Sequence, residues 1–314
     1  MSKRAENVPD ADIIIVTYNS AGDIVRCLDS ILRQETRYRY QVTVVDNASI
    51  DGTSEIIKLR FPEVRLLISD RNLGFAGANN LAVGQTYGQH VVFLNPDTEV
   101  KSGALDELLD FLRAHPEVGA VGPKLLNADG TLQLTGNTFP ALRNLLFETL
   151  FLDRLFPKTR LFGAHKLSFW DRQQPGPVDW VMGACIALPR AVGDKVGWFK
   201  EDFFMYFEET DFCRRLRGSG YRVYYVPSAE VVHFGGAGFE AYSASKVVMW
   251  HRSLLRYFER HHPEKIFWLR LLILFRSFLR SGLWLILSLR FGRFALLKSI
   301  GYLKTIWIMI GGGK

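Results

Sequence analysis

The run Val91-Val92-Phe93-Leu94-Asn95-Pro96-Asp97 joins an apolar segment to a polar tripeptide that carries a carboxylate at its tip. The apolar part is typical of a buried strand. Pro96 ends that strand, because proline has no backbone N–H and fixes its own φ, so Asp97 is aimed from just beyond it. In α/β proteins, ligands bind at the carboxyl ends of strands. Taken alone, the tripeptide is also compatible with a plain turn, so the rest of the chain decides between the two interpretations.

Strand-like and helix-like patterns alternate outward from this run. Short apolar runs predict strands at 12–17, 41–46, 64–68, 90–95 and 118–122. Apolar residues at helical spacing predict helices at 21–34, 55–60, 75–85 and 101–113. This alternation predicts an α/β fold with a Rossmann-like, mostly parallel sheet and helices on both faces.

The chain is less regular after residue 123. Residues 123–177 contain aromatic residues and Pro and Gly breaks, and we interpret them as an excursion over the site. Beyond them we expect a strand at 178–188, a helix within 203–220, and two short strands at 221–226 and 230–233.

Composition narrows the class of partner. The chain has 314 residues, of which 48% are hydrophobic, which allows one large domain or two smaller ones. Its formal net charge of +7 is compatible with nucleic acid, an anionic membrane surface or a phosphorylated substrate. Much of the positive charge lies after residue 250 among Trp, Phe and Leu, which favours a membrane surface. No RNA-binding signature or zinc-finger spacing is present, so we expect no nucleic-acid partner.

The cysteines and the N-terminus indicate a reducing compartment. Cys27, Cys185 and Cys213 are far apart and form no CxxC pair, which is typical of free, buried thiols. The N-terminal stretch from Met1 to Asp10 is polar and no apolar signal-peptide core follows it. We therefore expect a cytoplasmic protein.

The C-terminal region has a different character. Helical patterns continue from about Ala244 to residue 310, and basic residues interrupt the apolar stretch 266–310: Arg270, Arg276, Arg280, Arg290, Arg293, Lys298 and Lys304. No window contains the roughly 18 uncharged residues expected of a spanning helix. Trp268, Trp284 and Trp307 are aromatics typical of membrane interfaces. We expect one or two amphipathic helices in the headgroup region, in contact through residues 264–310. The alternative is a helical pair packed on the catalytic domain or on a partner subunit.

A second acid follows a predicted strand in the same way as Asp97. Asp46 ends the run Val44-Val45-Asp46 and is followed by Asn47, Ala48 and Ser49. A carboxylate at a strand end can accept hydrogen bonds from a ribose or from a pyrimidine N–H. It can also simply cap the next helix. Two acids at adjacent strand ends favour a binding role for both.

Several motifs together resemble family 2 glycosyltransferases of the GT-A fold. Three come early in the chain, namely Val16-Thr17-Tyr18-Asn19, Val45-Asp46-Asn47-Ala48-Ser49-x-Asp51-Gly52-Thr53 and Asn72-Leu73-Gly74-Phe75-Ala76-Gly77-Ala78-Asn79-Asn80. Two later motifs extend the resemblance over about residues 10–260, namely Glu208-Glu209-x-Asp211-x-Cys213-x-Arg215-Leu216 and Val231-Val232-His233. The family transfers a sugar from a nucleotide donor to an acceptor hydroxyl with inversion, using Mg²⁺ or Mn²⁺. The resemblance implies a GT-A catalytic domain at 10–240, followed by a helical membrane-interface region at 241–314.

The resemblance also assigns the donor side of the site. It implies that the nucleotide-sugar contacts Thr17, Tyr18, Asn19, Asp46, Asn72, Gly74, Asn79 and Asn95. The glycine-rich segment 72–80 lets the backbone and a helix N-terminus approach the nucleotide. The same composition is also typical of close packing between a helix and a sheet.

Two residues are assigned to a metal ion. Mg²⁺ is usually held by one or two carboxylates together with phosphates and waters, and Asp97 offers such an oxygen. The family usually has Asp-x-Asp where this chain has Asn95-Pro96-Asp97, so we assign Asn95 to the ribose or to a metal-bound water. His233 matches a metal ligand of some family members, and its imidazole suits Mn²⁺. The alternative for His233 is a residue that caps a strand edge.

The acceptor hydroxyl loses a proton as it attacks, so inversion requires a general base. Glu208, Glu209 and Asp211 lie near the start of a predicted helix, where the helix dipole also favours acids. The family pattern assigns Glu209 to the base. Asp211 is the second choice, or it organises Arg214 or Arg215. Glu208, Gly183 and Ala184 are assigned to the acceptor side, where small residues leave room for the sugar.

The stretch from His251 to Phe258 resembles bacterial rhamnosyltransferase-like members, and Arg252 within it is assigned to a diphosphate of the donor or acceptor. The alternative for Arg252 is a solvated helix face. The resemblance implies transfer of L-rhamnose from dTDP-rhamnose to a lipid-linked or surface glycan at the inner face of the membrane. A UDP-hexose donor, a silent nucleotide-sugar-binding module and a membrane scaffold remain as alternatives, and a homo-oligomer is left open.

Overall fold

The computed structural model of the protein describes residues 8–235 and 243–311. The predicted boundary at 240/241 and most of the predicted polar N-terminus lie outside the described residues. The strands are β1 Ala11–Thr17, β2 Tyr40–Asp46, β3 Arg65–Ile68, β4 His90–Leu94, β5 Thr98–Val100, β6 Val118–Leu126, β7 Leu132–Gln133, β8 Gly176–Val178, β9 Cys185–Pro189 and β10 Arg222–His233. The helices are α1 Ile24–Leu32, α2 Thr53–Arg60, α3 Gly74–Val83, α4 Ala104–Ala114, α5 Leu142–Thr149, α6 Leu152–Leu155, α7 Arg190–Val196, α8 Glu208–Gly218, α9 Ser243–His261 and α10 Ile266–Met309, with a 3₁₀ turn at Pro263–Lys265.

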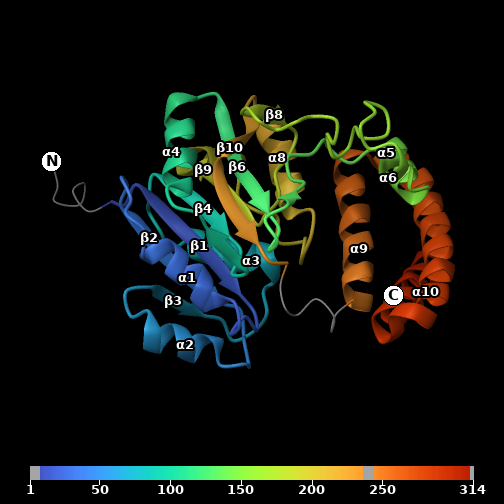
Figure 1. Ribbon diagram of the computed structural model, residues 1–314, viewed down its shortest axis with the longest axis horizontal. Helices are drawn as coiled ribbons and strands as arrows, with labels where there is room; N and C mark the ends of the chain where they lie inside the picture. The colour runs from blue at the N-terminus through green and yellow to red at the C-terminus, as the bar shows by residue number, and fades with distance from the viewer. Residues whose placement is uncertain (1–7, 236–242, 312–314) are drawn as a thin grey trace.

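One mixed sheet forms the centre of the molecule (Figure 1), with the strand order β3-β2-β1-β4-β9-β6-β10-β5. The first four of these strands are parallel, as the sequence predicts. β9 then enters antiparallel to both β4 and β6, and β5 and β8 pair antiparallel with β10. The α/β class is confirmed, and the parallel arrangement is limited to the first half of the sheet and the β6–β10 pair.

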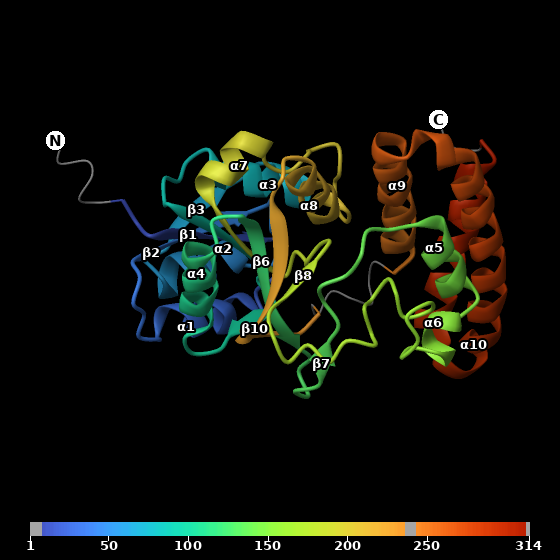
Figure 2. The same ribbon diagram turned by 90° about the horizontal axis from the view of Figure 1, so that it is seen from above.

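Helices cover both faces of the sheet, and each face has its own apolar core. Figure 2 shows α1 and α4 on one side and α3, α7 and α8 on the other. The first core joins the sheet to buried residues of α1 and α4 such as Leu28 and Leu108. The second joins it to α3 and α8 through residues such as Ala78 and Phe212. Burial on both faces explains why β1 and β4 read as continuous apolar runs in the sequence.

Two predicted strand boundaries are wrong. The single strand expected at 178–188 is two strands, β8 and β9, separated by a loop. The two strands expected at 221–226 and 230–233 are one strand, β10, which has an irregularity between Val226 and Glu230. Such an irregularity lets the strand bend without leaving the sheet.

The C-terminal helices stand beside the catalytic part (Figures 1 and 2) and share an apolar core with it. This third core joins Phe203 and Phe207, which precede α8, to Leu254 and Phe258 of α9 and to Ile273 of α10. The helices are therefore anchored on the loop that leads into the acids of α8.

α10 is two helices in sequence rather than one. Gly292 has φ 57° and ψ −140°, which breaks the helix and turns the chain back. The returning half packs on the outgoing half, where the Ser299 hydroxyl donates to the Ser281 carbonyl at 3.0 Å. It also packs on α9, because a Cβ built on Gly301 would lie 2.9 Å from the Cα of Ala244.

The outward face of α10 is apolar. The stretch Pro263–Met309 is long and apolar enough to cross a membrane by length and composition, with a mean hydropathy of 1.6 in its most apolar window. Phe278, Ile286 and Leu289 are 76%, 67% and 90% exposed. Arg276 and Arg280, which interrupt the stretch in sequence, point inward instead and contact Glu148 of α5. The exposed face is therefore less interrupted by charge than the sequence suggests.

Candidate active site

Polar residues gather at the carboxyl ends of the parallel strands. Thr17 ends β1 opposite Asp46, which ends β2. In the neighbouring pair, Leu94 at the end of β4 lies opposite Ile15. Because parallel strands present their carboxyl ends at one edge of the sheet, Thr17, Asp46 and the tripeptide 95–97 lie along the same edge. This is the position at which an α/β sheet binds ligands.

The ends of β1 and β2 carry buried polar groups. Asp46 is 1% exposed, and one of its carboxylate oxygens accepts the N–H of Ser49 at 3.0 Å. The Thr17 hydroxyl is buried and has no hydrogen-bond partner among the described residues. Since buried polar groups are normally paired, this hydroxyl indicates a partner supplied by a ligand or a water molecule.

Asn19 ties the loop after β1 to the loop after β2. Its φ is 53°, its N–H donates to the Ser49 hydroxyl at 2.9 Å, and its side-chain oxygen accepts the N–H of Ile50 at 2.9 Å. Tyr18 precedes it and is 43% exposed. The fixed loop therefore presents an aromatic ring beside Asp46, where a nucleotide base can stack.

The glycine-rich segment is held by Asn47, a residue that the sequence reasoning did not assign. Its amide donates to the side-chain oxygen of Asn72 at 3.0 Å and accepts the N–H of Leu73 at 2.8 Å. Gly74 has φ 73°, and a Cβ there would lie 2.4 Å from the Phe204 carbonyl oxygen. Gly74 is therefore required for close contact between the start of α3 and the loop before α8.

The structure also gives the surroundings of two further residues that are predicted to bind the donor. Asn79 is 1% exposed and its amide donates to the Phe75 carbonyl within the same helix, so it serves the packing of α3. Arg252 is exposed on α9, and its side chain makes no ion pair or hydrogen bond with any residue in the described ranges. Its neighbour His251 is buried. The donor-binding roles of Asn79 and Arg252 stay predictions.

Asp97 and His233 form one corner of the site. His233 ends β10 and pairs with Thr98 of β5, so the two chain segments run side by side. Its Nε2 lies 3.4 Å from Oδ1 of Asp97, and its Nδ1 lies 2.8 Å from the side-chain oxygen of Gln133. Gln133 comes from β7, and no motif in the sequence indicated it.

This corner fits a divalent cation. If Nδ1–H donates to Gln133, Nε2 keeps its lone pair and faces a carboxylate oxygen, an arrangement that a shared cation stabilises. Among residues 8–235 and 243–311, no group of three or more His, Cys, Asp or Glu side chains is arranged to hold a metal. Two protein ligands are enough where substrate phosphates and waters complete the coordination, as is usual for Mg²⁺.

The acceptor-side residues connect this corner to the acids of α8. The N–H of Asn95 donates to the Ala184 carbonyl at 2.9 Å, which joins the end of β4 to the segment before β9. Gly183, which precedes Ala184, lies against Glu209. A Cβ built on Gly183 would be 3.9 Å from the carboxyl carbon of Glu209. The backbone of Gly183 also lowers the pKa of Glu209. Asn95 and Glu209 are therefore bridged by two consecutive residues.

Glu208 and Glu209 start α8 as a buried acidic pair. Burial raises the pKa of Glu208 well above its ordinary value, and the charge of Glu209 raises it further. Burial also raises the pKa of Glu209, although backbone N–H groups including that of Gly183 offset part of this. Glu208 is 5% exposed, whereas Glu209 is partly open to solvent, and one oxygen of Glu209 has no hydrogen-bond partner among the described residues.

The backbone before this pair is strained. Tyr206 and Phe207 have φ values of 71° and 68°, in the left-handed region that side chains disfavour. The Ser253 hydroxyl of α9 donates to the Met205 carbonyl at 2.7 Å. α9 therefore helps to hold the strained turn that aims both glutamates.

Asp211 has the opposite environment to Glu209. It is fully buried and accepts hydrogen bonds from Arg215 at 2.8 Å, Arg260 at 3.1 Å and His261 at 2.8 Å. Although burial opposes it, these partners lower the pKa of Asp211 to about 2. A carboxylate engaged by two guanidinium groups and an imidazole is a weak base. Asp211 therefore organises α8 and α9, which was the alternative role expected for it, with Arg215 and not Arg214 as its partner on α8.

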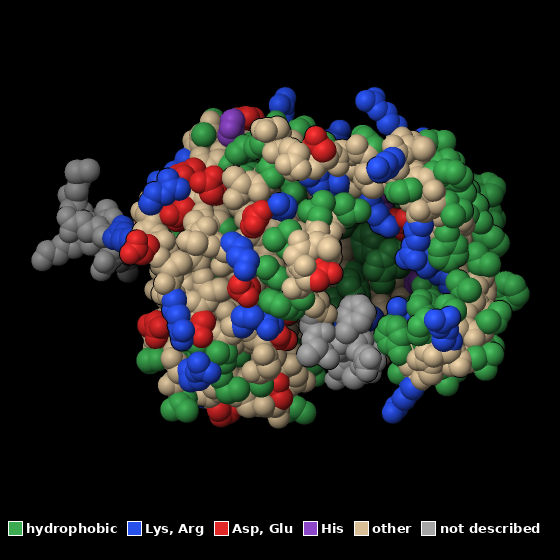
Figure 3. Space-filling view, viewed as in Figure 1, with side chains coloured by type: hydrophobic (Ala, Val, Ile, Leu, Met, Phe, Trp, Pro, Cys, Tyr) green, Lys and Arg blue, Asp and Glu red, His purple; other side chains and the backbone are tan. Residues whose placement is uncertain are grey.

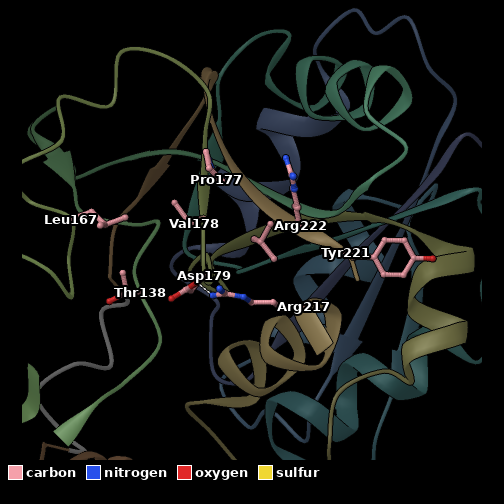
Figure 4. Close-up of a pocket in the computed structure, with 9 residues that line it drawn as sticks. Thr138, Leu167, Pro177, Val178, Asp179, Arg217, Tyr221 and Arg222 are labelled. Carbon is pink, nitrogen blue, oxygen red and sulfur yellow. Dashed lines mark hydrogen bonds and ion pairs between the residues drawn. The ribbon is translucent and has the colours of Figure 1, made fainter. Parts of the chain in front are cut away.

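A separate surface cavity does not belong to this site. It has a volume of about 340 Å³ and is lined by Thr138, Asp179, Arg217 and Tyr221 among others (Figure 4). Asp179 and Arg217 form an ion pair at its edge. None of the residues assigned to the donor, metal or acceptor lines it, so the chemistry is placed at the strand ends and the start of α8.

Comparison with known proteins identifies the class to which this site belongs. The mannosyltransferase PcManGT from Pyrobaculum calidifontis, solved with GDP-Man and Mn²⁺, has a TM-score of 0.56 at 18% identity, covering 98% of this chain and 88% of that one. GalNAc-T7, solved with UDP, GalNAc and Mn²⁺, has a TM-score of 0.58 at 15% identity, covering 98% of this chain and 57% of that one. These likenesses show a GT-A fold.

The sequence comparisons give the family. The model of the family described as "Glycosyl transferase family 2" matches residues 12–169 of the chain. The N-acetylglucosaminyl-diphospho-decaprenol L-rhamnosyltransferase of Mycobacterium tuberculosis is 31% identical over 263 residues, covering 80% of this chain and 84% of that protein. Rhamnosyltransferase WbbL of Escherichia coli is 25% identical over 264 residues, covering 79% of this chain and 92% of that protein. The chain belongs to glycosyltransferase family 2 and resembles bacterial rhamnosyltransferases.

Proposed function

We propose that the chain is an inverting glycosyltransferase that transfers L-rhamnose from dTDP-rhamnose to a hydroxyl group of a lipid-linked or surface glycan. The family supports the reaction class. Two relatives that are named as rhamnosyltransferases, and that align over most of this chain, support the sugar. The name of the mycobacterial relative, which specifies a diphospho-decaprenol acceptor, supports a lipid-linked acceptor here.

The observation that carries the proposal is the position of Glu209. Its carboxyl group lies against Gly183, where a Cβ would be 3.9 Å from the carboxyl carbon, and Gly183 precedes Ala184, whose carbonyl accepts the N–H of Asn95. The Oε2 atom of Glu209 is buried and has no hydrogen-bond partner among the described residues, while the side chain as a whole is partly exposed. A general base needs a carboxylate with an exposed part that is not engaged by other groups, because the acceptor hydroxyl must reach it and lose a proton to it during attack. The raised pKa brings Glu209 closer to neutral pH, where proton transfer is more effective.

Asp97 and His233 would hold a divalent cation, Mg²⁺ or Mn²⁺. When bound, the cation offsets the negative charge that grows on the departing nucleoside diphosphate. Gln133 orients the imidazole of His233, and Asn95 stands beside this corner on the donor side. The two structural neighbours that were solved with Mn²⁺ support the assignment.

The nucleotide would lie along the ends of β1 and β2. Asp46 would accept from the base or ribose, the unpaired hydroxyl of Thr17 would gain a partner, and the ring of Tyr18 would stack on the base. Asn19 and Asn72 shape this pocket through their bonds to neighbouring loops, and Gly74 keeps α3 close to it.

The proposed function assigns sugar transfer to the first part of the chain and membrane contact to the C-terminal part. We place the catalytic domain at 10–240 and the membrane-interface region at 241–314, with the protein on the inner face of the cell membrane. The exposed apolar face of α10 supports this placement. A protein at the inner face meets both a soluble nucleotide-sugar and an acceptor that is held in the membrane.

The test is a donor panel. The full-length protein is given dTDP-rhamnose, UDP-hexoses or GDP-mannose, each with Mg²⁺ or Mn²⁺ and a lipid-linked acceptor, and product is measured. We expect turnover with dTDP-rhamnose that is lost on adding a chelator. Turnover with a UDP-sugar alone would assign a hexose donor instead of rhamnose. Donor binding without any transfer would instead favour a nucleotide-sugar-binding module.

A further inference from the structure

A basic cavity lies between the loop before α8 and the C-terminal helices, outside the donor and metal corner described above. Its volume is about 280 Å³, and its polar lining consists of Tyr206, Lys246, His251, Arg276, Lys298 and Tyr302. Figure 3 shows the molecule hollowed between the catalytic part and the C-terminal helices, with Lys and Arg side chains along the wall. The three cations are Lys246 from α9, Arg276 from the outgoing half of α10 and Lys298 from its returning half.

Positive charge exceeds negative charge around this cavity. Glu148 of α5 is the carboxylate that pairs with Arg276, at 3.5 Å, and it shares its contacts with His165 at 3.7 Å. Burial lowers the pKa of Lys298, and the positive charges of Arg154 and Arg280 lower it further. The Lys298 ammonium is nevertheless held in place, 4.4 Å from the ring centroid of Trp284. Crowded cations of this kind are stabilised when an anion binds among them.

Buried polar atoms in the cavity lack protein partners. Nε of Arg276 has no hydrogen-bond acceptor among the described residues, and Nη1 makes an ion pair with Glu148 at 3.5 Å without a hydrogen bond. His251 is 2% exposed, its Nδ1 lies 2.8 Å from the Val247 carbonyl, and its Nε2 has no partner in the described part of the chain. Burial lowers the pKa of His251 to about 3, and the charge of Arg276 contributes. The cavity thus offers guanidinium donors for an anion and a neutral imidazole acceptor for a hydroxyl group.

The position of the cavity selects the ligand. On one side, Tyr206 lies three residues before Glu209, and the negative charge of Asp97 acts on Lys246. On the other side, the wall is α10, whose outward face exposes Phe278, Ile286 and Leu289. The cavity therefore lies between the side of the catalytic acids and the helix that carries the proposed membrane face. The donor nucleotide is instead placed at the ends of β1 and β2.

We propose that this cavity binds the diphosphate group of the lipid-linked acceptor. Arg276, Lys246 and Lys298 neutralise the two phosphates, and His251 accepts a hydroxyl of the attached sugar. The lipid leaves along α10, and the sugar extends past Tyr206 towards Glu209. This assignment rests on the proposed function for the nature of the acceptor, and it adds a second phosphate site to the one expected at Asp97 and His233.

The experiment compares two acceptors on the full-length protein. One is a short-chain prenyl-diphospho-N-acetylglucosamine, and the other is the octyl glycoside of the same sugar, which lacks the diphosphate. We expect Lys298→Gln to lower the ratio of their kcat/KM values about tenfold, because one charge-assisted contact is lost. Arg270→Gln, which changes an exposed arginine of the same helix, is the matched control and should keep the wild-type ratio. An unchanged ratio in Lys298→Gln and in Lys246→Gln would overturn the site.

A binding measurement separates this proposal from the proposed function. Farnesyl diphosphate is titrated calorimetrically into wild-type protein and into Lys298→Gln, with dTDP titrated in parallel. We expect the variant to bind farnesyl diphosphate about tenfold more weakly and to bind dTDP as the wild type does. This result without any sugar transfer would retain the site and reject the reaction. Weaker binding of dTDP alone would assign the cavity to the donor and overturn the proposal, as would equal binding of farnesyl diphosphate by both proteins.

Discussion

At the scale of single residues, Glu209 and Asp211 show how environment separates the roles of two nearby acids. Both lie in the first turn of α8, where the helix dipole favours negative charge. Glu209 has a raised pKa and an oxygen without a hydrogen-bond partner, whereas Asp211 has a pKa lowered to about 2 and bonds to two arginines and a histidine. Contacts made by other elements, and not position on the helix, decide which acid can accept a proton.

The first prediction concerns Glu209→Gln. The amide keeps the shape of the side chain but cannot accept the acceptor proton, so we expect kcat to fall by roughly 10²- to 10⁴-fold. The KM for the donor should change little, because Glu209 lies on the acceptor side. Steady-state kinetics with the preferred donor measure both constants. Glu259→Gln, at an exposed position on α9, is the control and should retain full activity. A variant at position 209 with normal kcat would remove Glu209 from the base role.

A second prediction follows from the raised pKa values of Glu208 and Glu209. The base must be ionised, so kcat/KM should rise with pH through a midpoint above the ordinary glutamate range. Glu208→Gln removes a carboxyl group that is still protonated when Glu209 ionises, because the charge of Glu209 raises the pKa of Glu208. We therefore expect the midpoint of this rise to stay close to that of the wild type, measured as a pH profile of kcat/KM. A midpoint that shifts to lower pH would mean that Glu208 is the first of the two acids to ionise.

At the scale of elements, Asp211 is the link between α8 and α9. Since its folded-state pKa is depressed, its stabilising effect is present above the ordinary value of 3.8 and is lost as pH falls towards about 2. We expect Asp211→Asn to lower the free energy of unfolding by about 2 kcal/mol at pH 7, and by progressively less below pH 4. Denaturant titrations at several pH values measure this. Asp202→Asn, which breaks the more exposed bond to Arg260, should cost under about 1 kcal/mol.

The turn at Gly292 is a second feature at this scale. Its φ of 57° and ψ of −140° suit glycine, and a Cβ would meet nothing within 4 Å, so a substitution tests backbone strain alone. Gly292→Ala should lower the free energy of unfolding by about 1–3 kcal/mol. Gly282→Ala, inside the same helix and equally free of contacts, should instead be neutral or stabilising by up to about 1 kcal/mol. Equal effects of the two changes, measured by thermal unfolding, would show that the turn is not strained.

Elements were predictable from sequence where burial alone determines them. β1, β2 and β4 are apolar runs ended by Thr17, Asp46 and the Asn95 turn, so both the strands and the site at their ends could be read. The direction of β9 could not, because a strand buried on both faces has the same pattern whether it is parallel or antiparallel. Gln133 and Asn47 were missed as site residues because their roles depend on contacts between distant segments. Gly292 was missed because a single glycine inside a helical pattern is usually tolerated.

At the scale of the whole molecule, the apolar face of α10 predicts membrane binding. Full burial of an apolar side chain contributes about 2 kcal/mol, so replacing both Ile286 and Leu289 by Ser should weaken binding to lipid vesicles more than tenfold. Vesicle co-sedimentation with anionic lipids measures this. Replacing Ile50 and Leu59, which are 91% and 85% exposed on the catalytic part, is the matched control and should leave binding unchanged. If both pairs have the same effect, α10 is not the contact.

The sequence pattern could not show which way the basic residues of this region point. Arg276 and Arg280 share a face of α10, which suggested that they meet lipid headgroups. They face inward because Glu148, Trp250 and Phe151 supply an ion pair and aromatic rings there. An amphipathic pattern reveals that a helix has two faces, but only tertiary contacts determine which one meets solvent, lipid or ligand.

The return of the chain at Gly292 has a practical consequence. The returning half of α10 carries Lys298 and Tyr302 and packs Gly301 against α9. It therefore forms part of the lining of the basic cavity. A shortened protein that ends at Gly292 would keep the residues assigned to the donor and metal. It would lack part of the basic cavity that is proposed to bind the acceptor diphosphate. We expect such a protein to hydrolyse its nucleotide-sugar, because water would take the place of the missing alcohol. The part of α10 after Gly292 would then determine whether the sugar is transferred to the acceptor or released by hydrolysis.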